Sequence, residues 1–171
     1  MWRLQGPMTL KLILTKLHYS LFSLFRKKHI FNEDETKQIT NAIRNAEQRT
    51  SGEVRVFAES HCRWVDAIDR AAELFFMLQM EKTAERNAVL VYVAIKDRQL
   101  AVFGDEGIHH KVGTPYWNKV VSEMLSSFNK HNYAEGIAHC VEQVGEALHK
   151  HFPYNKDIDK NELPDDIVFG R

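Results

Sequence analysis

Residues 87–107, NAVLVYVAIKDRQLAVFGDEG, predict the centre of the fold. The apolar run Ala88–Ile95 is rich in valine and too short for an ordinary buried helix, so it predicts a central β-strand. Lys96–Arg98 supplies a turn, and Gln99–Phe103 returns as a second strand. The segment Gly104–Gly107 then places two carboxylates between two glycines. The stretch therefore predicts a β-hairpin that leads into an acidic loop.

The residues before the hairpin predict a parallel β-α-β unit. Glu53–Glu59 alternates apolar and polar residues, which is typical of a β-strand. Trp64–Met80 carries apolar residues at helical intervals and predicts a crossover helix to Ala88–Ile95. Such crossovers are right-handed and join parallel strands. Ahead of this unit, a capping-box pattern at Asn32 begins a helix that ends near Arg49.

Two helices are predicted after the hairpin. Thr114 and Pro115 suit the N-cap and the first helical position of the first of them. Five residues of its apolar stripe are predicted to be core: Trp117, Val120, Val121, Met124 and Phe128. Ala134–His151 predicts the last long helix, which Pro153 ends. The hairpin and the first strand should therefore form the sheet on which the helices pack.

Composition narrows the classes of function. The 171 residues suit one domain with a tail, and 44% hydrophobic residues are enough for a core. Lys plus Arg and Asp plus Glu each number 23, so the net formal charge is zero and does not attract nucleic acid. Cys62 and Cys140 lie far apart without CxxC spacing, which favours free thiols in a reducing compartment. We therefore expect a cytoplasmic protein that does not bind nucleic acid.

The chain divides into three predicted regions. They are an amphipathic N-terminal segment at 1–31, an α/β domain at 32–153 and an acidic C-terminal tail at 154–171. Lysines interrupt the apolar residues of Thr9–Phe25, so this stretch predicts neither a transmembrane helix nor a secretion signal. Two interpretations stay open: it docks on the domain's own core, or residues 9–28 contact a membrane surface or a protein partner, with the protein peripheral at the membrane. The apolar residues Ile167–Phe169 are expected to fold back onto the domain.

Three motifs in this order resemble the TPM domain family. They are TSGEV at 50–54, the hairpin sequence NAVLVYVAIKDRQLAVFGDEGI, and YAEGI at 133–137. The resemblance covers Asn32–Phe152. It implies an α/β/α sandwich on a small mixed sheet, an association of some members with divalent metals such as calcium, and phosphatase activity in some plant members. The family usually has an acidic residue before the asparagine and a glycine after it, whereas this chain has ERNA at 85–88.

Strand direction predicts which carboxylates meet. If the first and central strands run parallel and Gln99–Phe103 runs back, the acidic loop lies at the edge where the first two strands begin. Hard cations such as calcium take about six to eight oxygen ligands, and a glycine-flanked acidic loop offers carboxylates and carbonyls together. We therefore predict a divalent cation site, most suited to Ca²⁺, at Asp105, Glu106, Glu53 and Asn87. The alternative is that the two acidic loop residues are solvated or cap the next segment.

Two classes of function stay open. The first is a non-enzymatic interaction module in which the cation organises a surface for a protein partner. The second is a metal-assisted phosphatase for phosphomonoesters, in which the cation polarises a phosphoryl oxygen and Arg86 would hold the anion. We prefer the first because the sequence names no nucleophile with a positioned base. It also contains no P-loop, GxGxxG or GxSxG motif.

Overall fold

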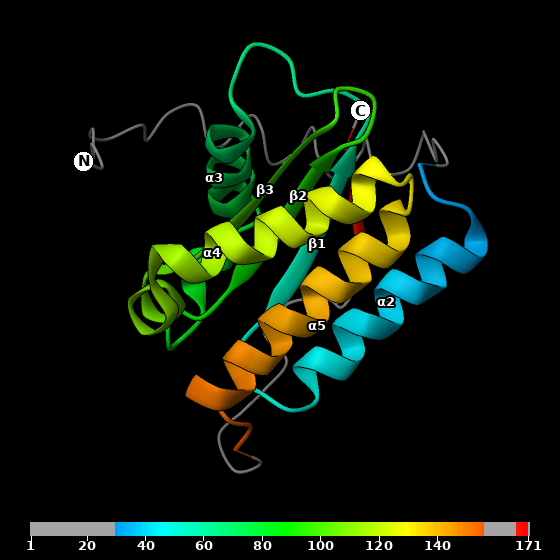
Figure 1. The fold of residues 1–171 in the computed structure, drawn as a ribbon. Coiled ribbons are helices and arrows are strands. Elements are labelled where there is room, and N and C mark those ends of the chain that lie inside the picture. The colour runs from blue at the N-terminus through cyan, green and yellow to red at the C-terminus, as the bar shows by residue number, and fades with distance from the viewer. Residues whose placement is uncertain (1–29, 156–166, 171) are drawn as a thin grey trace.

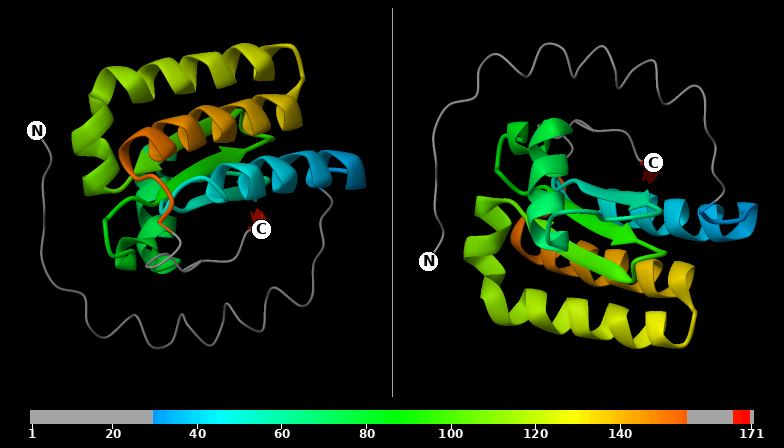
Figure 2. Two further views of the ribbon diagram at one scale, coloured as in Figure 1. Left: turned by 90° about the horizontal axis from the view of Figure 1, so that it is seen from below. Right: turned by 90° about the horizontal axis from the view of Figure 1, so that it is seen from above.

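The computed structural model describes residues 30–155 and 167–170. Its elements, in chain order, are α2 (Glu33–Glu47), β1 (Val54–Glu59), α3 (Ala67–Met77), the 3-10 helix η1 (Met80–Lys82), β2 (Val89–Ala94), β3 (Gln99–Gly104), α4 (Glu106–Asn129), α5 (Tyr133–His151) and β4 (Ile167–Phe169). The strands form one sheet in the order β3-β2-β1-β4. Helices α2, α4 and α5 cover one face and α3 lies on the other (Figures 1 and 2). The predicted α/β/α sandwich is confirmed.

The β-α-β unit and the hairpin form as predicted. Strand β1 runs parallel to β2, and β2 runs antiparallel to β3. One row across the sheet joins Val54, Val89 and Gly104. Both β1 and β2 are buried along their whole length, including the polar residues Arg55 and Glu59. Apolar and polar residues alternate along β1, but the side of the sheet that carries the polar residues is buried as well. The alternation therefore does not mark a solvent-exposed face.

The apolar stripe after the hairpin is core over most of its length. Four of the five predicted residues are buried: Trp117, Val120, Met124 and Phe128. Val121 is partly buried against the same core. Leu125, the apolar residue that follows Met124 in the sequence, is exposed. The stripe is thus narrower than the periodicity suggested, because α4 packs along one side against α5 and β3.

The predicted acidic loop is in fact the start of a helix. Asp105 is the N-cap of α4, its side chain accepts a hydrogen bond from the Glu106 backbone N–H, and the helix begins at Glu106. Gly113, with φ 73° and ψ 170°, interrupts α4, which resumes at Thr114, the predicted start. The glycines around Asp105 and Glu106 suggested a loop, but acidic residues are also favourable in the first turn of a helix. The structure therefore supports the capping alternative for Asp105.

The C-terminal residues complete the sheet. Ile167–Phe169 forms β4 parallel to β1, with Val56 opposite Ile167. The ring of Phe169 lies 6.4 Å from that of Phe31 at the start of α2. The predicted amphipathic segment at 9–28 and residues 156–166 of the acidic tail lie outside the described residues. Among the described residues, no helix is both long and apolar enough to cross a membrane.

Cys140 provides a first test of the packing. It is a free thiol in the core of α5, and burial raises its pKa to about 12. Because the thiolate is the reactive form, we expect Cys140 in a Cys62→Ser variant to resist alkylation at about pH 8 until the protein unfolds. Mass spectrometry of samples labelled with and without denaturant measures this difference. Fast labelling of the native variant would contradict the buried position.

Candidate functional site

The four residues of the predicted cation site gather at one edge of the sheet. Here the backbone carbonyl of Glu53 accepts from the Val89 N–H at 2.8 Å, and the Asp105 N–H donates to the Ala88 carbonyl at 2.9 Å. These bonds continue the strand register and bring the residues before β1 and β2 to the start of α4. The proximity predicted from strand direction is confirmed. Whether a cation binds there stays a prediction.

Asp105 already has a positively charged partner. Arg86 donates from Nε to Oδ2 and from Nη2 to Oδ1 of Asp105, both at 2.7 Å. The Asp105 side chain is 4% exposed, whereas that of Arg86 is 44% exposed. The hydrogen bond to Asp105 raises the pKa of Arg86 above its ordinary value. Both carboxylate oxygens of Asp105 are therefore engaged, and direct binding to an ion would compete with Arg86.

Gly107 has a packing role at this edge. A Cβ atom there would lie 2.2 Å from the Glu85 carbonyl oxygen and 2.7 Å from that of Arg86. The Gly107 N–H donates to the Arg86 carbonyl at 2.8 Å. The absence of a side chain thus lets the first turn of α4 approach the backbone that leads into β2. This contact accounts for the glycine that sequence reasoning assigned to a metal-binding loop.

Asn87 carries the polar atom that best fits a ligand. The residue is 1% exposed, and its Nδ2 donates to the Ser51 hydroxyl at 3.3 Å. That hydroxyl donates to Glu85 Oε2 at 2.5 Å. Asn87 Oδ1 is buried and accepts no hydrogen bond from any described residue. A buried acceptor without a partner costs about 1–3 kcal/mol, and a bound water or cation would remove that cost.

Several acidic residues act on Arg86, the residue before Asn87. Arg86 is influenced by the charges of Asp105, Glu106 and Glu81, and Glu85 lies next to it in the chain. The described residues nevertheless contain no group of three or more His, Cys, Asp and Glu side chains arranged to hold a metal ion. The donors are oxygens, which suits a hard cation such as calcium. The acidic residues form a charged edge around the unsatisfied Asn87 oxygen and not a ready cage of carboxylates.

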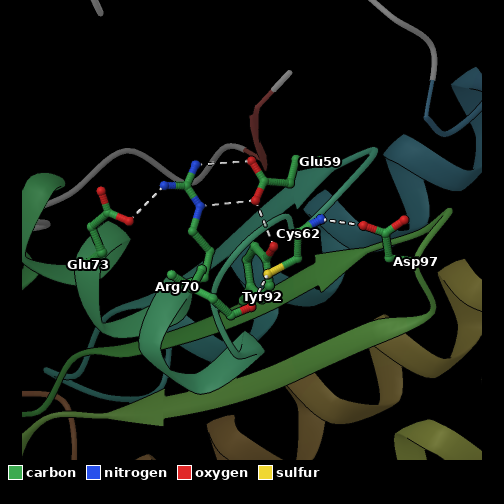
Figure 3. Close-up of polar contacts among 7 residues, drawn as sticks. Glu59, Cys62, Arg70, Glu73, Tyr92 and Asp97 are labelled. Atoms are coloured by element: carbon green, nitrogen blue, oxygen red, sulfur yellow. Dashed lines mark hydrogen bonds and ion pairs between the residues drawn. The ribbon is translucent and has the colours of Figure 1, made fainter.

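A second polar cluster lies at the opposite edge, where β1 ends (Figure 3). Arg70 donates from Nε and Nη2 to the two oxygens of Glu59, each at 3.1 Å, and from Nη1 to Glu73 at 2.9 Å. The Tyr92 hydroxyl donates to Glu59 Oε1 at 2.6 Å. Neither Arg70 nor Tyr92 was assigned to a site from the sequence. The available signal was Arg70, a charged residue one turn into the crossover helix that follows β1.

Asp97 connects the hairpin turn to the segment after β1. Its Oδ1 lies 2.7 Å from His61 Nδ1, and its Oδ2 accepts from the Cys62 N–H at 2.8 Å. The bond to His61 lowers the pKa of Asp97 below its ordinary value. The arrangement fixes one ring nitrogen of His61. No described residue is hydrogen-bonded to the other ring nitrogen.

A four-stranded mixed sheet with three helices on one face and one on the other defines the structural class. The chain belongs to the TPM domain family, which it matches over residues 24–147. Its structure is similar to that of the BA42 protein from the psychrophilic bacterium Bizionia argentinensis, with 37% identity, a TM-score of 0.77 and coverage of 85% of this chain and 99% of that chain. The N-terminal domain of cg2496 from Corynebacterium glutamicum shares the fold, with 15% identity, a TM-score of 0.55 and coverage of 71% and 76%. A search of curated proteins found no match.

Proposed function

We propose that this protein is a non-enzymatic interaction module that binds a divalent cation, most suitably Ca²⁺, at the edge formed by Glu53, Asn87, Asp105 and Glu106. The observation that carries the proposal is the buried Asn87 Oδ1, which lacks a hydrogen-bond partner among the described residues. It lies next to Arg86, which is under the influence of the carboxylates of Asp105, Glu106 and Glu81. A cation there satisfies the oxygen and reduces the repulsion between the carboxylates.

Each residue has a distinct role in this proposal. Asn87 Oδ1 is an inner ligand, and the exposed carboxylate of Glu106 attracts and binds the ion from the solvent side. Asp105 keeps its bond to Arg86 and holds the start of α4 in place. Glu53 is buried and adds negative charge beneath the site. The bound ion would join β2 to α4 and so order the surface that a protein partner contacts.

Arg86 is the reason for preferring binding over phosphomonoester hydrolysis. A phosphatase needs a cationic side chain whose hydrogen-bond donors face the phosphate. Arg86 is the residue expected for this role, but its Nε and one terminal nitrogen are directed at Asp105. The geometry therefore supports Arg86 as a positioning residue for the edge. Metal-dependent hydrolysis of p-nitrophenyl phosphate that is lost in Arg86→Met would contradict this assignment.

Calcium titration followed by thermal unfolding tests the proposed site. The wild type should gain stability as calcium rises, by about 2.7 kcal/mol at a concentration 100 times the Kd. Glu106→Gln removes an exposed charge without disturbing the core, so the variant should fold normally and lose most of the gain. Glu142→Gln, an exposed carboxylate on α5, is the matched control and should keep it. Amide NMR shifts should change first at residues 85–87 and 105–107.

Two results would reject the site. One is a wild type whose melting temperature does not respond to calcium of about 1 mM, a range typical of weak calcium modules. The other is an equal gain in the wild type and in Glu106→Gln. In either case the unsatisfied oxygen of Asn87 would be assigned to a buried water.

A further inference from the structure

Strand β3 is an edge strand with open hydrogen-bonding groups. Within the described residues it pairs with β2 alone, as the strand order shows. Its sequence, QLAVFG, contains no charged residue and no proline. Natural sheets usually protect such edges with lysine, proline, a bulge or a covering segment. An uncharged edge strand of six residues is therefore suited to pairing with another strand.

The register identifies the groups that face outward. Asp105 donates to the Ala88 carbonyl on the β2 side, and in an antiparallel pair the bonded residues alternate. Ala101 and Phe103 therefore bond to β2, while the N–H and C=O groups of Leu100, Val102 and Gly104 point away from it. The Val89 N–H, opposite Gly104, agrees with this alternation because it donates to Glu53 on the other side of β2.

Helix α3 adds an apolar surface beside this edge. It packs over β3 and β2, at the side of the sheet away from β4 (Figure 1). Ile68 and Phe76, two turns apart on α3, are 39% and 54% exposed. The Phe76 ring lies 6.4 Å from that of Phe103 on β3. An open strand flanked by exposed large apolar side chains is a common feature of association surfaces.

We propose that β3 and the exposed side of α3 form a homodimer interface, in which β3 pairs antiparallel with β3 of a second copy and joins the two sheets. A two-fold axis at Val102 pairs Val102 with its counterpart and Leu100 with Gly104 of the second copy. These are the residues whose backbone groups point outward, and each pair exchanges two hydrogen bonds. On the α3 face the same register sets the large Phe103 beside the small Ala101 of the second copy.

Charge complementarity argues for a second copy as the occupant. An antiparallel pair brings Arg98, in the turn just before β3, to the same end of the strand pair as Glu106 of the second copy, where α4 begins just after β3. Arg98 and Glu106 are both exposed. The two-fold axis repeats the pair, so two Arg–Glu contacts flank the strand pair. A parallel arrangement would instead place arginine against arginine. The zero net charge of the chain also means that two copies do not repel each other overall.

Sedimentation equilibrium of the full-length protein tests the interface. The measurement covers about 10–300 μM protein, where an interface of this limited size should show partial dimerisation. EDTA is present throughout, so cation binding at Glu106 does not enter the result. Phe76→Glu should abolish the dimer, because it buries a charge between the two α3 helices. The matched control is Tyr154→Glu, which changes a 49% exposed aromatic residue next to Arg49, beyond the end of α2, and should leave the dimer intact.

Charge reversal distinguishes this register from other modes of association. Arg98→Glu alone sets glutamate against Glu106 twice, and Glu106→Arg alone sets arginine against Arg98 twice. Each should weaken the dimer about 10- to 100-fold. An equimolar mixture of the two variants restores both opposite-charge contacts, so a heterodimer should form with nearly wild-type affinity. A monomeric wild type at the highest concentration overturns the proposal, and so does a dimer that neither the reversals nor Phe76→Glu weakens.

Discussion

Replacing Trp117 with alanine should lower the free energy of unfolding by about 3–5 kcal/mol. Trp117 is buried at the junction of α4 and β3. Its ring covers Gly104, where a Cβ atom would lie only 2.5 Å from the indole. Its Nε1 donates to His109 Nδ1 at 3.1 Å, which joins the two parts of α4 across the interruption at Gly113. The substitution therefore removes both a large apolar contact and the bond that sets the angle of the helix.

Urea unfolding followed by far-UV circular dichroism measures this loss. Leu125→Ala is the control on the same helix, because Leu125 is exposed, and it should cost less than about 1 kcal/mol. Phe128→Ala, at a buried position further along the stripe, should fall between the two. Equal midpoints for Trp117→Ala and the wild type would mean that the stripe of α4 faces solvent.

The pattern of apolar residues in the sequence predicted the strands β1, β2 and β3 correctly. Strands β1, β2 and β3 differ from their predicted bounds by one residue at most at each end. A valine-rich run can be recognised from local sequence because both faces of a central strand are apolar. The capping box at Asn32 is likewise formed by neighbours in the chain, with its side chain accepting from the Glu35 N–H. Local signals of this kind require no knowledge of tertiary contacts.

The start of α4 was predicted wrongly because it depends on tertiary contacts that are not evident from the sequence. Glycines around Asp105 and Glu106 suggested a loop, yet the first of them accommodates Trp117 and the second the backbone of Glu85. Both are close approaches between segments distant in the chain. Local sequence cannot distinguish a glycine needed for a turn from one needed for packing. The helix therefore began earlier than its Thr-Pro signal indicated.

The position of the candidate site was predicted, but the ion pair between Arg86 and Asp105 was not. Strand direction alone brought Asp105 to the edge beside Asn87. The partner of Asp105 could not be derived, because Arg86 reaches it from a backbone with φ 53°, a conformation that few arginines adopt. The residues of β4 were expected to fold back onto the domain, but the strand itself was not predicted, for a related reason. Three residues, Ile167–Phe169, carry too little periodicity to indicate a strand until β1 is there to pair with them.

Replacing Arg70 with methionine should cost about 3 kcal/mol of unfolding free energy, the second large effect. Arg70 is the cationic partner of Glu59, whose side chain is 5% exposed. Burial lowers the pKa of Arg70, but its hydrogen bonds to Glu59 more than offset this and raise it overall. Methionine keeps much of the packing volume and removes the charge. The Glu59 carboxylate is then left in the core with the Tyr92 hydroxyl as its remaining side-chain donor among the described residues.

The Glu73→Gln variant allows the buried Arg70–Glu59 pair to be compared with the exposed Arg70–Glu73 pair. Glu73 is the exposed partner of Arg70, so its loss should cost less than about 1 kcal/mol. Glu59→Gln in the Arg70→Met background removes the uncompensated charge and should recover part of the stability, which a double-mutant cycle measures as a coupling energy. If Arg70→Met costs no more than Glu73→Gln, Glu59 does not depend on Arg70. If the double variant is no more stable than Arg70→Met alone, the loss comes from packing and not from the buried carboxylate.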